Sequence, residues 1–379
     1  MPDKMKYFQV NWSDGMKINK SHFTSLENSI SERINDALQT GITSYNYGLL
    51  PSPGAKEAPL KIILHLDNQQ TLRIKVFECS AVTPGGNRID IYETTDIKEF
   101  AVPMPETVYE IPQIRQEDVF VCLSINPFKP VPIGQVDPGE EPPRYPYTIP
   151  ESKVHLIPES QLGKKESGLN LLLIGKIHVA EGGPELVRDY IPPCTSVLSH
   201  PALVSSHADF ERFLGQMETD LVTIMRKIKD KEQTNVLAVT LASIAEPLLF
   251  YLSTGILAFR WKIPSQPPLL MFEYIAQGAR IIKNSLDASS GKAKEELLNY
   301  FTEWCTISQG DFETMLLRTV NFDYDHSDIR KTLDIMTQYA EVISALFSKL
   351  STLEYIGKKK ETSIFVKEQT VNKKSFLAD

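Results

Sequence analysis

The sequence has few cysteines and no excess of basic over acidic residues. Its four cysteines, Cys79, Cys122, Cys194 and Cys305, lie far apart and form no Cys-x-x-Cys pair. This spacing argues against a zinc ribbon or a disulfide framework and fits a reducing cytoplasm. The net charge is −8, whereas general nucleic-acid binders usually carry excess positive charge. We therefore expect no nucleic-acid partner.

Secretory and membrane signals are also weak. The opening residues, Met1-Pro2-Asp3-Lys4, contain no apolar core of the kind found in a signal peptide. The segment from Val236 to Trp261 has only two charged residues, Glu246 and Arg260, and is long enough to suggest a membrane span. Because Glu246-Pro247 lies in its middle, we favour a helix buried on all sides within a soluble bundle. No direct membrane span is expected.

Proline is scarce in the last part of the chain. Of 25 prolines, 21 lie at or before Pro201. Because proline removes an amide donor and breaks helix interiors, the first part is expected to hold strands and loops, while the second can be helical. A length of 379 residues also predicts two or more domains.

Alternating apolar residues predict strands near residues 60–66, 72–76, 119–125 and 169–179. The fourth strand carries Leu169, Leu171 and Leu173, then Ile177 and Val179. Strands separated by turns without helical periods predict an antiparallel sandwich or barrel. A proline-rich excursion over residues 126–150 interrupts the pattern, and loops of that length often bind partners.

The second part has helical spacing, opened by a predicted capping box at Ser206 and Asp209. Two apolar seams alternate in steps of four and three, over residues 210–228 and 329–350. Three more helices are predicted between them, from about Gln233, after Pro267-Pro268, and from Lys292 to about Ser308, which makes a bundle of four or five. The seams need a facing apolar partner, and an intrachain bundle or an oligomeric stalk satisfies that need equally. The candidate oligomerisation residues are Phe210, Leu214, Met217, Leu221, Ile329, Leu333, Met336 and Ile343.

Patterns of catalytic or metal-binding residues are weak. Gly168 to Lys176 ends in Gly-Lys but has the wrong spacing for a phosphate loop, and there is no Gly-x-Ser-x-Gly elbow. His200 and His207 are seven residues apart, whereas metal pairs on helices usually lie three or four apart. We assign no catalytic residue, cofactor or metal.

The excursion contains an acidic cluster, Asp137, Glu140 and Glu141, followed by Arg144, Tyr145 and Tyr147. The carboxylates could serve acid/base chemistry or hold calcium, although a solvated turn is favoured. Arginine and tyrosine are common anchors at protein interfaces. Arg144, Tyr145 and Tyr147 are therefore candidate partner-binding residues, with stacking inside the loop as the alternative.

The N-terminal run Trp12-Ser13-Asp14-Gly15-Met16, followed by His22-Phe23, fits no catalytic or metal pattern. An arm whose Trp and Phe pack onto the first domain would explain it. The run also resembles the opening of the type VI secretion baseplate family TssK, typically Trp-x-Glu-Gly-Met and then His-Phe. Asp14 replaces the usual Glu, and Lys20 stands where Pro is more common. Weaker similarity continues to about residue 350 and includes Tyr47-Gly48-Leu49-Leu50 and Tyr324-Asp325-His326.

The resemblance implies a shoulder sandwich, a helical neck and a C-terminal head, assembled as a homotrimer without known enzymatic activity. In that family the shoulder docks onto the wedge proteins TssF and TssG, and the head reaches the membrane-anchoring complex. Only about 29 residues follow Leu350. The resemblance thus implies a reduced member, whose lysine-rich tail is the remaining candidate for that second contact.

The sequence therefore predicts an α+β multidomain protein. The expected parts are a docking arm (1–24), a β-sandwich shoulder (25–204), a helical-bundle neck (205–352) and a basic tail (353–379). The expected function is a non-enzymatic, trimeric, cytoplasmic baseplate adaptor at the inner membrane, which binds partners first through Trp12, Gly15, Met16, His22 and Phe23. The alternatives are a protein resembling phage-tail receptor-binding proteins and a β-sandwich glycan-processing enzyme.

Overall fold

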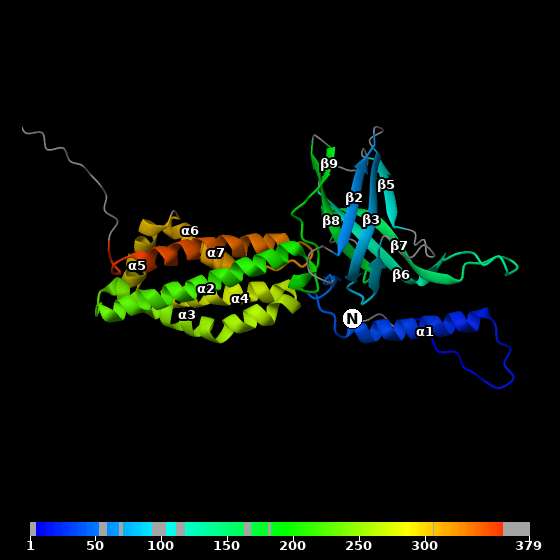
Figure 1. Ribbon diagram of the computed structural model, residues 1–379, viewed down its shortest axis with the longest axis horizontal. Helices are drawn as coiled ribbons and strands as arrows, with labels where there is room; N and C mark the ends of the chain where they lie inside the picture. The colour runs from blue at the N-terminus through cyan, green and yellow to red at the C-terminus, as the bar shows by residue number, and fades with distance from the viewer. Residues whose placement is uncertain are drawn as a thin grey trace, which may run out of the picture.

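The computed structural model describes residues 5–52, 59–67, 71–92, 104–110, 118–162, 168–180, 183–305 and 307–358. These residues form a β-sandwich and a helical bundle that lie end to end, with an N-terminal helix alongside the sandwich (Figure 1). The predicted α+β class is confirmed. Most of the predicted basic tail, residues 359–379, lies outside the described residues.

Two antiparallel sheets make the sandwich. The first surrounds β3 (Thr71–Val82), which pairs with β1 (Gly48–Leu49), β2 (Leu60–Leu66), β4 (Arg88–Ile91) and β5 (Glu106–Glu110). The second has the order β7 (Tyr147–Pro158), β6 (Val119–Ile133), β8 (Leu171–Ala180) and β9 (Gly183–Leu186). Ile74 of one sheet and Leu123 of the other belong to a single buried core. The predicted sandwich is therefore correct.

A β-bulge changes which residues of β8 face the core. Val121 pairs with Gly175 and Cys122 with Leu173, so Ile174 is the extra residue. Leu172 and Ile174 consequently enter the main core, whereas Leu171 and Leu173 pack on a small cluster behind the sheet. The sequence placed Leu171 and Leu173 on the same face as Ile177 and Val179. This was wrong, because the one inserted residue moves the side chains before it to the opposite face of the sheet.

The predicted proline-rich loop is a long β-hairpin. Strands β6 and β7 stay paired from Pro130 opposite Pro150 to Ile133 opposite Tyr147. This part of β6 has no strand on its other side among the described residues, and such edge positions are where strands tolerate proline. The hairpin extends away from the rest of the sandwich (Figure 1).

The bundle contains α2 (Pro201–Asp230), α3 (Val236–Trp261), α4 (Pro268–Ala288), α5 (Gly291–Trp304), α6 (Gln309–Val320) and α7 (Ile329–Thr352). Three short 3-10 segments, Glu159–Gln161, Val197–Ser199 and Ile263–Ser265, lie in connections. Helix α6 was not predicted. It separates from α5 because the Ser308 hydroxyl caps a new helix by accepting from the Asp311 amide at 3.2 Å.

Three predicted details of helix position are wrong. Helix α2 begins at Pro201, where the His200 ring caps it, and Ser206 lies inside it. The boundary predicted at 204/205 therefore falls within α2. The arm boundary predicted at 24/25 falls within α1 (Lys20–Gln39). Helix α3 is not buried on all sides, since Phe250 and Trp261 are largely exposed. Among the described residues, α3 is also the one helix long and apolar enough to cross a membrane.

The joint between sandwich and bundle brings together two stretches that resemble TssK in the sequence. Gly48 has φ +111°, and a Cβ there would lie 2.0 Å from the Pro193 carbonyl oxygen, so only glycine fits. The Leu49 amide donates to that carbonyl at 2.8 Å. The Tyr190 hydroxyl donates to the Ser327 carbonyl at 2.6 Å. Hydrogen bonds to the backbone carbonyls of Pro193 and Ser327 thus hold the joint together.

His326 is buried at this joint. Its Nε2 lies 2.9 Å from the Tyr47 carbonyl oxygen, which can only accept, so Nε2 carries a proton. Its Nδ1 lies 2.7 Å from the Tyr324 hydroxyl and accepts from it. A neutral ring therefore satisfies both contacts, and burial lowers the pKa of His326 to about 4.

We expect His326 to make stability depend on pH. Its folded pKa of about 4 lies below the ordinary value of 6.5, so between these values the unfolded chain binds a proton that the folded chain does not. Its contribution is present above pH 6.5 and is lost as the pH falls towards 4. The stability difference between wild type and His326→Gln, measured by thermal unfolding, should therefore shrink on acidification.

The control is His65→Gln, at an exposed position of β2. It should leave the pH profile of the wild type unchanged. A stability difference between wild type and His326→Gln that stays constant between neutral pH and pH 4 would contradict this account of the joint.

Candidate partner-binding surface

The N-terminal unit consists of an arm, residues 5–19, and helix α1. Asn19 caps the helix, because its side chain accepts from the Ser21 amide at 3.0 Å. The Asn19 amide in turn donates to Nδ1 of His22 at 3.3 Å. The predicted partner-binding residue His22 therefore also completes a reciprocal capping box that fixes where α1 begins.

The residues of the N-terminal motif lie together. The Trp12 ring is 6.1 Å from the His22 ring and 6.5 Å from the Phe23 ring, centroid to centroid. Gly15 has φ +79°, in the left-handed region that favours glycine, within a turn closed by the Met16 amide and the Ser13 carbonyl. This turn brings the arm back onto α1. Trp12 remains 46% exposed and Phe23 53% exposed, so the cluster is accessible to a partner.

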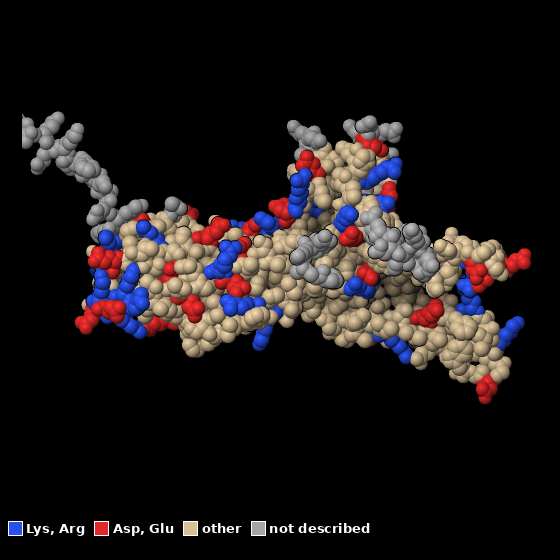
Figure 2. Space-filling view, viewed as in Figure 1, with Lys and Arg blue, Asp and Glu red and all other residues tan. Residues whose placement is uncertain are grey.

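Helix α1 carries an uncovered apolar stripe. Phe23, Ile30, Ile34 and Leu38 are 48–55% exposed. The last three recur at steps of four, which places them on one face. A lone helix of this length is marginal in water, because most helix stability in proteins comes from tertiary packing. Figure 2 shows the N-terminal unit as mostly uncharged surface with isolated charges. We call these four side chains the α1 stripe.

Side chains of α1 contact both the sandwich and the arm. The Gln39 side-chain amide donates to the Gly85 carbonyl at 3.0 Å, at the C-terminal end of the helix. The Glu32 carboxylate accepts from the amides of Lys6 and Tyr7 at 2.7 and 2.8 Å. The Tyr7 ring then contacts the Phe128 ring of the hairpin, 4.6 Å away. The arm thus links α1 to the hairpin and leaves the stripe free.

The second set of predicted partner-binding residues, Arg144, Tyr145 and Tyr147, lies near the tip of the hairpin. Arg144 is tied to Glu140 by an ion pair, which raises the pKa of its guanidinium. Tyr145 and Tyr147 are about half exposed. The hairpin and α1 extend in the same direction from the sandwich (Figure 1). The two predicted sets therefore lie at the same end of the molecule, on different elements.

Sequence reasoning missed the α1 stripe. Residues 25–39 were assigned to the sandwich, although Leu26, Ile30, Ile34 and Leu38 repeat at steps of four and Asn19 precedes them as a cap. This signal was present in the sequence but is shorter than the seams of α2 and α7.

The predicted oligomerisation residues lie in the core of a single chain. Helix α2 packs against α7, so the two seams cover one another. All eight side chains are at most 3% exposed and offer no surface to a second copy: Phe210, Leu214, Met217, Leu221, Ile329, Leu333, Met336 and Ile343. The assignment of these residues to oligomerisation is therefore wrong, although the prediction that they are buried is correct.

Polar contacts reinforce this pairing. The Asp220 carboxylate is 5% exposed and accepts from the hydroxyls of Ser348 and Ser351, each at 2.8 Å. Lys227 donates to the Leu353 carbonyl at 2.7 Å, and Ile356 is fully buried. Residues 353–356, predicted as tail, thus pack onto the bundle.

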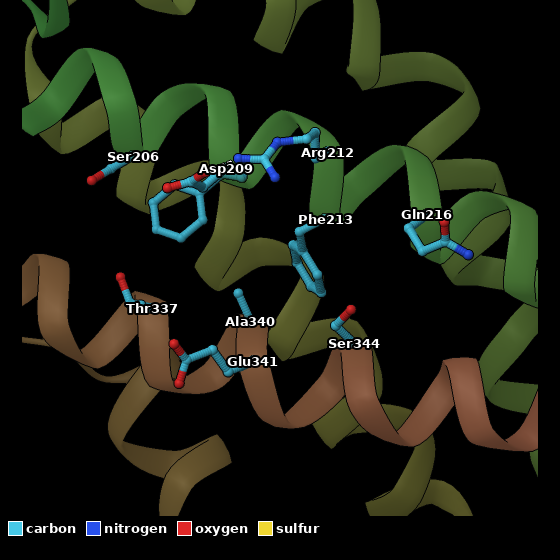
Figure 3. Close-up of a pocket in the computed structure, with 10 residues that line it drawn as sticks. Ser206, Asp209, Arg212, Phe213, Gln216, Thr337, Ala340, Glu341 and Ser344 are labelled. Atoms are coloured by element: carbon cyan, nitrogen blue, oxygen red, sulfur yellow. Dashed lines mark hydrogen bonds and ion pairs between the residues drawn. The ribbon is translucent and has the colours of Figure 1, made fainter.

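A groove of about 510 Å³ lies between α2 and α7. Figure 3 shows Phe213 and Ala340 at its centre, with Asp209 and Arg212 on one helix and Glu341 on the other. Asp209 pairs with Arg212 at the exposed rim.

A second concavity, of about 330 Å³, lies at the joint. Its Asp118 accepts from Lys176 at 2.8 Å and from His178 at 2.7 Å. Partial desolvation would raise the pKa of Asp118, but these hydrogen bonds outweigh it and lower the pKa. Asp118 is thus held ionised in a structural ion pair. Among the described residues, no group of three or more His, Cys, Asp or Glu side chains could hold a metal ion.

Comparison with known proteins identifies the fold. No family model and no curated protein matches the chain. A chain of the type VI secretion system TssK-TssF-TssG baseplate subcomplex matches with a TM-score of 0.51 and 14% identity, covering 89% of this chain and 99% of that one. A crystal structure of TssK matches with a TM-score of 0.49 and 15% identity, covering 89% of this chain and 69% of that one. TssK from the EAEC type VI secretion system, bound to a nanobody, matches with a TM-score of 0.48 and 16% identity, covering 84% of this chain and 66% of that one.

The described residues therefore define a two-part scaffold in which an antiparallel sandwich precedes a helical bundle. This is the fold of TssK, and the resemblance noted in the sequence is confirmed at the level of the fold. The chain spans about two thirds of the length of the two separately solved TssK chains.

If the α2–α7 seam is core, its truncation should destabilise each chain by itself. Leu221→Ala is expected to cost roughly 2–5 kcal/mol, because it leaves a cavity at a fully buried position. Leu317→Ala, at an exposed position of α6, should stay within about 0.5 kcal/mol.

Denaturant unfolding at two protein concentrations measures both variants. The difference between wild type and Leu221→Ala should be the same at each concentration. A difference that grows on dilution would show that the seam joins separate chains.

Proposed function

We propose that this chain is a non-enzymatic, homotrimeric adaptor of a type VI secretion baseplate. In this role it binds wedge proteins of the TssF and TssG type through its N-terminal unit. It links them to a membrane-anchoring complex at the cytoplasmic face of the inner membrane. The observation that carries the proposal is the α1 stripe, an apolar helix face left uncovered on a scaffold with the TssK fold.

The geometry of the N-terminal unit supports a protein partner. Interface anchors are commonly Trp, Tyr and Arg side chains surrounded by apolar contacts. Trp12 and Phe23 lie at the start of the stripe, while Ile34 and Leu38 extend it for several turns. A partner helix or strand laid along α1 would bury both the aromatic cluster and the stripe. The hairpin tip, with Tyr145 and Tyr147, would be the second contact.

A non-enzymatic role is supported by the state of three carboxylates at these concavities, Asp118, Asp209 and Asp328. Asp209 pairs with Arg212, and Asp118 pairs with Lys176. Asp328 has its pKa raised by burial but lies 3.4 Å from Lys331. A glycosidase needs one carboxylic acid and one carboxylate flanking the scissile bond. These cation-paired carboxylates favour the adaptor over the glycan-processing alternative.

The test is retention of purified TssF and TssG type wedge proteins on the immobilised full chain. Trp12→Ala and Ile34→Asp should each weaken retention about tenfold or more, because truncating or charging an anchor costs 2 kcal/mol or more at a hot spot. Circular dichroism should show the bundle intact in both variants.

The matched controls are Ile63→Asp, an exposed isoleucine of β2, and Tyr355→Ala, an exposed aromatic at the far end of the bundle. Both should bind like wild type. If Trp12→Ala and Ile34→Asp also bind like wild type, the N-terminal unit is not the docking surface.

A further inference from the structure

A pocket of about 180 Å³ lies where the outer side of the second sheet meets the joint. Leu171 and Leu173, which the β8 bulge keeps out of the main core, both line it. The apolar lining residues are Pro84, Ile157, Leu162, Leu171 and Leu173. The bulge therefore supplies apolar side chains to a site that the sandwich core does not use. We call this site the joint pocket.

The joint pocket has the size and chemistry to hold one aromatic ring. Sites for small molecules usually measure roughly 300–1,000 Å³, so a cofactor would not fit. An engineered apolar cavity of about 150 Å³ binds benzene. Among the described residues that line the joint pocket, none is charged. A charged side chain would therefore lose its hydration there without gaining an ionic partner.

The polar residues of the pocket leave one group for a main-chain contact. The Ser327 hydroxyl is already used, since it donates to the Asp325 carboxylate at 2.5 Å. The Tyr47 carbonyl is used by His326 at the joint. The exposed side chain of Gln161 has no hydrogen-bond partner among the described residues. It can bond the main chain beside an inserted ring without breaking a contact of the joint.

Apolar side chains lead from the α1 stripe to the joint pocket. Leu38, the last residue of the stripe, lies against Gly86, because a Cβ there would be 3.2 Å from the Leu38 Cβ. The neighbouring Gly85 lies against Leu169, which is 41% exposed, since a Cβ there would be 2.8 Å from the Leu169 Cβ. Pro84 of the same turn lines the pocket. The pocket is therefore continuous with the candidate docking surface.

Hydrogen bonds fix the pocket relative to the stripe. The Gln39 side-chain amide donates to the Gly85 carbonyl at 3.0 Å, which ties the end of α1 to the turn. The Asn87 amide donates to the Asn170 side chain at 2.6 Å, which ties the same turn to the residue before β8. A partner that lies along α1 thus meets a pocket that is already formed, and preformed sites avoid the cost of ordering on binding.

We propose that the joint pocket binds one aromatic side chain, a phenylalanine, of the partner that lies along the α1 stripe. The stripe can accept many apolar surfaces, whereas the pocket selects a side chain of one size and rejects charge. The joint pocket is thus the specificity site of the docking surface. This inference rests on the proposed function, because the partner it describes is the wedge protein.

The first test fills the pocket. Leu171→Trp places a larger side chain there and leaves the α1 stripe unchanged. Retention of purified TssF and TssG type wedge proteins on the immobilised full chain should fall about tenfold or more, because the apolar burial of one ring is lost. The matched control is Ile63→Trp, at an exposed position of β2, which should bind like wild type. Wild-type retention by Leu171→Trp would overturn the proposal.

The second test needs no variant, so misfolding cannot confuse it. The wild-type full chain with isotope-labelled leucine methyl groups is titrated with N-acetyl-phenylalaninamide and followed by nuclear magnetic resonance. The methyl signals of Leu171 and Leu173 should shift, whereas those of the exposed Leu317 should not. N-acetyl-alaninamide, which lacks the ring, should leave all of them in place. No shift at Leu171 and Leu173 would overturn the proposal.

The outcomes separate this inference from the proposed function. Retention that is lost in Trp12→Ala but unchanged in Leu171→Trp would overturn the pocket and keep the proposed function. No retention by the wild-type chain would overturn the proposed function, and the inferred partner with it. Signals of Leu171 and Leu173 that shift with protein concentration alone would identify a second copy as the occupant and overturn the wedge protein in that place.

Discussion

An amphipathic helix needs its apolar face covered, and this constraint organises the whole chain. Helices α2 and α7 satisfy it together, since their heptad seams bury one another, and Asp220 adds hydrogen bonds to Ser348 and Ser351. Helix α3 satisfies it on one side only. Helix α1 satisfies it least, because Ser29 is the one buried residue of this helix. The uncovered faces are therefore where this protein can interact with others.

The joint fixes the sandwich relative to the bundle. Gly48 lies directly against the Pro193 backbone, and His326 connects Tyr324 to the Tyr47 carbonyl. In the proposed homotrimer, several N-terminal units on one assembly would gain affinity for a multivalent partner without any new contact at a single site. In the proposed baseplate adaptor, the sandwich end with its N-terminal unit would hold the wedge.

Much of the fold could be predicted from the sequence, because periodicity reports burial. The alternation in β3 and β6 and the seams of α2 and α7 marked core residues correctly. Periodicity does not say what covers a seam, so residues such as Leu214 and Leu333 were assigned to an interface that the chain itself fills. Local irregularities were also hidden: Ile174 reverses the phase of β8, and His200 rather than Ser206 caps α2. At the candidate site, the motif located Trp12 and Phe23, but the α1 stripe beyond them went unnoticed.

The most direct test of the central claim is amide hydrogen exchange along the full chain, alone and with purified wedge proteins of the TssF and TssG type. If uncovered helix faces are the binding surfaces, α1 should exchange rapidly in the free chain and become strongly protected in the complex. Helices α2 and α7 should be protected in both states, because their seams are already buried. Rapid exchange of α1 in the complex, or protection of α1 in the free monomer equal to that of α2, would contradict the account.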